Sequence, residues 1–197
     1  MERLFLVFIG LCFSVCVRAQ TYEFINEVFK SSNQDTILLM DKFVVFSEEG
    51  INTRFNKSNI ENLWAPLIYS DEVPSIEVFF NNFNLNHLRV NLISNRDDTK
   101  IDFSHLDDTF ISVTENDLKE IQEKWKNNSK FEENKRYLNK LYLKVSNPIF
   151  NCSKDWVVVI TESFSPFLDI GTSGYMNIYR KLKGKWVLYN RLELWIS

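Results

Sequence analysis

Seven residues in the middle of the chain are of the types that bind transition metals or transfer protons. They include both histidines of the sequence and five aspartates: His87, Asp97, Asp98, Asp102, His105, Asp107 and Asp108. Histidine and carboxylate side chains together can hold a metal or act as general acid and base. Their spacing matches neither HExxH nor an EF-hand loop, and aspartates beside asparagine and threonine are typical of turns. We therefore predict turns, no metal and no cofactor, with a hydrolase site as the alternative.

Two other residues are candidate nucleophiles. Ser173, in the run Gly171-Thr172-Ser173-Gly174, superficially resembles a serine elbow, but the G-x-S-x-G pattern is missing and no histidine is near in sequence. Only Lys154 lies close enough in sequence to activate the thiol of Cys152. We predict that Ser173 lies in a loop, that the Cys152 thiol is unreactive, and that neither residue is catalytic.

The third candidate site consists of four polar residues near the C-terminus: Tyr175, Asn177, Tyr179 and Asn190. The first three alternate along one expected strand, and a two-residue turn at Lys183-Gly184 would place Asn177 opposite Asn190 and Tyr179 opposite Leu188. A one-residue bulge would change this register. Such side chains could line a small-molecule or glycan pocket. The pattern favours the alternative, an asparagine pair that satisfies itself among core aromatics.

These residues belong to a C-terminal stretch of four expected strands, at residues 141–146, 156–160, 175–181 and 186–197. The run from Trp156 to Ile160 is apolar at every position, as in a central strand covered on both faces. In the last strand five apolar residues share a parity that only Asn190 interrupts, namely Trp186, Leu188, Leu192, Leu194 and Ile196. The pattern predicts an antiparallel meander. In its last strand, the side that carries these five apolar residues is expected to face the core.

Several motifs follow one another in this stretch: Pro148-Ile149-Phe150, the apolar strand, a glycine-containing loop, Gly184-Lys185-Trp186 and a terminal Trp195-Ile196-Ser197. In this order they resemble the C-terminal β-meander of small exported bacterial proteins of unknown function. The resemblance implies export and a fold type, but no activity. It covers only this stretch, and the loop before the third strand lacks the cysteines that such proteins often carry.

The first residues have the pattern of a secretory signal peptide. Arg3 precedes an apolar run from Leu4 to Val17, and Val17-Arg18-Ala19 fits a signal-peptidase site. The run is shorter than the about 20 apolar residues that span a bilayer. We expect a signal peptide at residues 1–19, a single α+β domain at residues 20–197, and a periplasmic or extracellular protein without a transmembrane span. The alternative is a lipoprotein signal ending at Cys16.

The remaining sequence predicts short helices and further strands. Helices are expected at residues 22–31, 58–64 and 115–126, a strand or hairpin at 36–46, a loop at 48–57, and strands at 76–80, 87–93 and 109–113. The expected fold is α+β, an antiparallel sheet with a C-terminal meander covered by a few short helices.

The composition narrows the function classes. The chain has 197 residues, of which 23 are basic and 26 acidic, a net charge of -3. Binding to nucleic acid usually needs a basic patch, so we expect no nucleic-acid partner. The favoured function is a binding or interaction module of the cell envelope, with a small-molecule, glycan or protein partner. A hydrolase using His87 and His105 and a structural or assembly-assisting domain are the alternatives.

Overall fold

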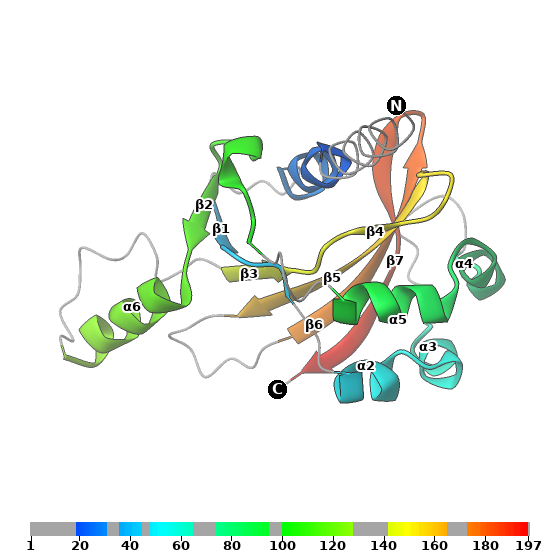
Figure 1. The fold of residues 1–197 in the computed structure, drawn as a ribbon, viewed down its shortest axis with the longest axis horizontal. Coiled ribbons are helices and arrows are strands. Elements are labelled where there is room, and N and C mark those ends of the chain that lie inside the picture. The colour runs from blue at the N-terminus through cyan, green and yellow to red at the C-terminus, as the bar shows by residue number, and fades with distance from the viewer. Residues whose placement is uncertain are drawn as a thin grey trace, which may run out of the picture.

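The computed structural model describes residues 19–30, 36–44, 48–64, 74–94, 100–127, 142–164 and 173–196. They form a mixed, mostly antiparallel seven-stranded sheet with helices on both faces (Figure 1). The strands are β1 Ile37–Met40, β2 Phe110–Val113, β3 Tyr142–Val145, β4 Ile149–Phe150, β5 Trp156–Phe164, β6 Ser173–Leu182 and β7 Lys185–Ile196. Their order is β2-β1-β3-β5-β6-β7, with β4 beside β5. The expected α+β class and the C-terminal meander are confirmed.

Strand β5 is the centre of the meander, as its composition predicts. It pairs with β3 and β4 on one side and β6 on the other, all antiparallel. Every residue from Trp156 to Ile160 is at most 4% exposed. Pro148 separates β3 from β4, and the Ser146 hydroxyl bridges this break by accepting a bond from the Ile160 amide at 2.9 Å. The apolar run is therefore covered on both faces.

The β6–β7 hairpin forms at the predicted turn, but its register differs from the expected one. Lys183 and Gly184 both have positive φ, at 50° and 83°, as a tight type I′ turn requires. Tyr179 lies opposite Leu188 as predicted, whereas a bulge at Tyr189 then pairs Asn190 with Ile178. The expected pairing of Asn177 with Asn190 is therefore wrong.

The bulge also overturns the prediction of one core-facing side along β7. Before it, Trp186 and Leu188 pack on one face of the sheet, and after it Leu192 and Leu194 pack on the other. A bulge adds one residue to a strand, so the alternation of side chains is reversed beyond it. The Asn190 Oδ1 stabilises the irregular backbone by accepting from the Arg191 amide at 2.9 Å.

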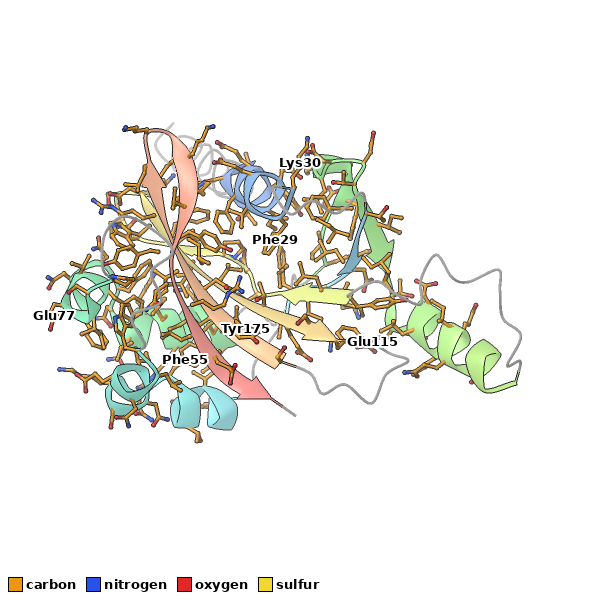
Figure 2. All side chains as sticks on the ribbon, turned by 180° about the vertical axis from the view of Figure 1, so that it is seen from behind. Phe29, Lys30, Phe55, Glu77, Glu115 and Tyr175 are labelled. Carbon is orange, nitrogen blue, oxygen red and sulfur yellow. The ribbon has the colours of Figure 1, made fainter. Side chains whose placement is uncertain are left out.

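Each face of the sheet has its own core and its own helices. Residues 19–30 are helical, so the helix predicted from residue 22 is present but begins earlier, and this N-terminal helix packs on one face with Phe24 and Ile25 fully buried. The other face is covered by α2 Glu48–Arg54, α3 Lys57–Leu63, α4 Ile76–Asn82 and α5 Leu85–Ser94. Figure 2 shows Phe29 and Phe55 on opposite sides of the sheet.

Three helices on the second face stand where the sequence predicts loop or strand. Residues 48–57 are mainly α2 rather than loop, and the strands expected at 76–80 and 87–93 are α4 and α5. Phe79 and Phe83, and likewise Leu88 and Leu92, are buried four residues apart, which is helical spacing. The Ser75 side chain caps α4 by accepting from the Val78 amide. Aromatic and β-branched content favoured strands, but the period of the buried positions is that of a helix.

The remaining elements extend the sheet on the β1 side. Strand β1 is parallel to both β2 and β3, so the hairpin considered for residues 36–46 does not form within the described residues. Helix α6 Glu115–Asn127 begins at the predicted capping box, where the Thr114 hydroxyl and the Asp117 carboxylate bond each other's amides. The predicted signal peptide, apart from Ala19, lies outside the described residues.

Candidate functional site

The histidines of the first candidate site lie on opposite faces of the sheet. His87 belongs to α5, whose buried residues Leu88 and Leu92 pack in the core under α2–α5. His105 ends the short 3-10 helix η1 Phe103–His105, which packs against the N-terminal helix on the other face. Within the described residues no group of three or more His, Cys, Asp or Glu side chains is placed to hold a metal ion. The convergence that a hydrolase site would need is not found there; Asp97 and Asp98 lie outside the described residues.

The residues around His105 form turns and helix contacts, as the sequence predicts. Asp102 caps η1 by accepting from the Ser104 amide at 3.0 Å, and its carboxylate lies 3.7 Å from the exposed His105 ring. The Asn26 side chain bonds the His105 carbonyl and the Asp107 amide, and so fastens this segment to the N-terminal helix. These contacts explain the polar residues as turn and docking groups.

Neither candidate nucleophile is part of a catalytic arrangement among the described residues. Ser173 begins β6 and lies opposite Ser163 of β5, so the loop predicted at this residue is wrong, and Ser173 belongs to a regular strand and not to an elbow. Gly171 and Thr172 lie outside the described residues. Cys152 is exposed in the turn between β4 and β5.

Three of the four residues of the third candidate site share a face, and the fourth does not. Tyr175, Asn177 and Tyr179 alternate along β6 on the face that carries the N-terminal helix. Asn190 is fully buried on the opposite face, opposite Ile178, because the bulge at Tyr189 turns it away. Its Nδ2 has no partner among the described residues. Asn190 is therefore not part of the strip.

Two residues that the sequence did not single out complete this polar region. Asn177, which is 1% exposed, donates from Nδ2 to the Thr161 hydroxyl of β5 at 2.8 Å. Its Oδ1 accepts a bond from Nε of Arg191 on β7, also at 2.8 Å. The Arg191 guanidinium lies 5.4 Å from the centre of the Tyr175 ring. We call these five residues the Arg191 cluster: Thr161, Tyr175, Asn177, Tyr179 and Arg191.

Arg191 is a partly buried cation whose contacts with other described residues are all with neutral groups. Asn177 fixes its Nε, and Tyr175 supports the guanidinium plane. No ion pair involves Arg191 within the described part of the chain, where Glu193 is the one acidic residue of β7 and is exposed. A guanidinium has five N–H donors, so donors remain beyond those that the cluster uses. As far as the structure describes the chain, the site therefore offers oriented donors and a positive charge without an acidic partner.

Tyr179 links the cluster to the core under the N-terminal helix. Its ring meets Phe24 edge-on at 5.4 Å, and it is 7% exposed. Burial raises the pKa of the Tyr179 phenol to about 12, although the charge of Arg191 and a hydrogen bond to it act in the opposite direction. The phenol is therefore neutral over the physiological pH range and serves as a hydrogen-bonding group.

The signal for Arg191 was in the sequence but depended on the register. Without the bulge, residue 191 would lie on the opposite face from Asn177, and Asn190 would take its place. With the bulge, Arg191 is directly opposite Asn177. Thr161 follows the apolar run of β5 and lies two and four residues after Val159 and Val157. This spacing alone indicated that its side chain is on the same face as theirs.

Comparisons with protein-family models, curated proteins and solved structures find no match for this chain. Among the described residues, no helix combines the length and the apolar character needed to cross a membrane.

Proposed function

We propose that this protein is an exported binding module, and that the Arg191 cluster receives the anionic group of a small molecule or glycan. The single observation that supports this proposal is the Arg191 guanidinium, which is partly buried and held by neutral partners. Withdrawing a charge from water is unfavourable unless an opposite charge or hydrogen-bond acceptors replace the water. A bound carboxylate, phosphate or sulfate would provide both.

The surroundings of Arg191 are suited to binding rather than to chemistry. Asn177 and Tyr175 hold the guanidinium in one orientation, which lowers the entropy that ligand binding would cost. The Tyr175 ring is partly exposed beside the charge, and tyrosine provides an apolar surface with a polar end for a sugar or a similar ligand. Figure 2 shows Tyr175 on the strand that crosses the middle of this face.

The test uses ligand pairs that differ only in charge. D-glucuronate and D-glucose share a ring but differ in the carboxylate, so saturation-transfer NMR can compare them on the same protein. We expect glucuronate to bind more tightly than glucose, and Arg191→Gln to weaken glucuronate binding about 10- to 100-fold, the usual range for losing a bond to a charged group. Arg191→Lys should retain part of the affinity, because it keeps the charge but not the planar fork.

Asn177→Asp provides a matched test at the same site. It keeps the size of the side chain but places a carboxylate against Arg191, and this carboxylate supplies a counter-charge from within the protein. We expect this variant to remain folded and to lose glucuronate binding.

The stability of Arg191→Gln distinguishes a ligand group from a structural one. Because Arg191 has no acidic partner among the described residues, its neutral variant should unfold in urea within about 1 kcal/mol of wild type, whereas breaking a buried ion pair costs several. Equal binding of glucuronate and glucose, or unchanged glucuronate binding in Arg191→Gln, would refute the proposal.

A further inference from the structure

One end of the sheet carries basic residues on two neighbouring turns. The turn between β4 and β5 and the β6–β7 hairpin together contribute five cations, which we call the basic end: Lys154, Arg180, Lys181, Lys183 and Lys185. The two turns are adjacent, because the Lys181 amide donates to the Asp155 carbonyl at 2.7 Å. This concentration of charge occurs on a chain whose net charge is -3.

Three of these cations, Lys154, Lys183 and Lys185, are exposed and have no ion-pair partner within the described residues. The other two are engaged, since Lys181 lies 3.8 Å from Glu23 and Arg180 lies over the Trp156 ring at 5.3 Å.

The acidic residues at this end are also engaged. Besides Glu23, Glu27 accepts the Trp186 amide at 2.7 Å, and Asp155 accepts the Asn151 side chain at 2.9 Å. Hydrogen bonds from neutral donors leave these carboxylates charged, so five cations against three anions give this end a net charge of +2.

Two of the exposed lysines occupy backbone positions that favour other residues. Lys154 and Lys183 have φ of 59° and 50°, and they are the only non-glycine residues with positive φ in the described part of the chain. Asparagine and glycine adopt this conformation more readily than lysine does. Asparagine at both positions would therefore remove the two charges without straining the backbone.

The start of the N-terminal helix adjoins the basic end. Ala19, Gln20 and Glu23 line a hollow of about 390 Å³ together with Lys154, Lys181 and Trp186. Trp186 lies at this hollow beside the lysines, and tryptophan is enriched where protein meets the bilayer surface.

We propose that the basic end docks on an anionic phospholipid surface, through Lys154, Lys183 and Lys185. This goes beyond the proposed function, because it involves different residues at the end of the sheet away from Arg191. Lysines attract anionic headgroups without a fixed geometry, and each contributes about 1 kcal/mol near such a surface. A nucleic acid fits less well, because binding along its backbone usually neutralises more phosphates than three lysines can reach.

The experiment is a vesicle sedimentation assay with the full 197-residue chain. Vesicles of phosphatidylcholine alone are compared with vesicles that also contain phosphatidylglycerol. The readout is the partition coefficient on the phosphatidylglycerol vesicles divided by that on the phosphatidylcholine vesicles. The apolar run is identical in all variants, so it cancels from comparisons between them. We expect the ratio to fall about fivefold for each of Lys154→Gln, Lys183→Gln and Lys185→Gln, the equivalent of about 1 kcal/mol each, and to fall in wild type when salt is raised.

The matched control removes the same charge elsewhere. Lys57, Lys100 and Lys119 are exposed at α3, ahead of η1 and on α6, and their triple glutamine variant should keep the wild-type ratio. A second variant, Lys154→Asn with Lys183→Asn, suits the positive φ of both turns and should lose docking while remaining at least as stable in urea.

Three results would overturn the proposal. They are a ratio near one for wild type, an equal loss in the control variant, or tighter binding to duplex DNA than to phosphatidylglycerol vesicles at the same salt. Glucuronate binding should be unchanged in the lysine variants, so this proposal and that for the Arg191 cluster can fail separately.

Discussion

The sheet face beneath the N-terminal helix has two ends of opposite character on the same strands. At one end Phe24 packs on Tyr179, Trp186 and Phe150 with ring centres 5.4 to 6.0 Å apart. At the other end, hydrogen bonds join Thr161, Asn177 and Arg191. The first end is closed by a helix, and the second contains a cation that has no acidic partner within the described ranges. The comparison indicates that the apolar end maintains the fold, and the polar end is where we propose that a ligand binds.

The largest expected effect is at the apolar end. Phe24 is fully buried and touches three aromatic rings, so Phe24→Ala should leave a cavity and lower the free energy of unfolding by about 3 to 5 kcal/mol. Urea unfolding measures this loss. Phe29→Ala is the control, since Phe29 is only partly buried in the same core and should cost less.

Below its denaturation midpoint, Phe24→Ala should still bind glucuronate as wild type does. Lost binding in the folded variant would show that the two ends do not act separately.

The second effect is a pH dependence at the border between the two ends. The Tyr179 pKa is raised to about 12 in the folded protein, compared with about 10 when unfolded. The unfolded chain therefore loses its proton first, so the stability that is present below pH 10 should be lost as pH rises toward 12. The loss is about 2 to 3 kcal/mol, at 1.36 kcal/mol for each pKa unit.

Urea unfolding at several alkaline pH values would measure this, with Tyr179→Phe as the reference. Other groups titrate in the same range, so the relevant quantity is the difference between the two proteins. If that difference is constant from pH 9 to 12, the phenol is not buried as described.

The apolar end was predictable from the sequence because its signals are local. The unbroken run from Trp156 to Ile160 indicates a strand covered on both faces, and the spacing of Ile25, Val28 and Phe29 indicates a helix. The turn at Lys183-Gly184 likewise follows from the backbone freedom of glycine. None of these inferences depends on which distant strand lies alongside.

The polar end was only partly predictable because it depends on one bulge. The prediction that Tyr175, Asn177 and Tyr179 share a face is correct. Because Tyr189 is an extra residue in β7, Arg191 and not Asn190 lies opposite Asn177. Bulges leave little trace in a hydrophobic pattern, since both residues at the site can be buried. The helices α4 and α5 were missed for a related reason, because aromatic residues fit either a strand or a buried helix face.

The smallest expected effect on the free energy of unfolding comes from removing one hydroxyl at the polar end. It can be compared with the effect of introducing a hydroxyl at the apolar end. Thr161 accepts the Asn177 amide at 2.8 Å, and valine has nearly the same shape without the hydroxyl. Thr161→Val should therefore lower the free energy of unfolding by about 1 kcal/mol, because Nδ2 of Asn177 keeps only its longer contact with the Tyr175 carbonyl at 3.4 Å.

The reverse exchange, Val157→Thr, lies on the same strand and the same face and buries a hydroxyl among apolar side chains. It should cost about 1 to 3 kcal/mol, since no acceptor compensates for the lost water. Urea unfolding of both variants decides the matter: a Thr161→Val protein more stable than wild type would mean that the polar end is not held by its hydrogen bonds, and that Arg191 is not oriented by them.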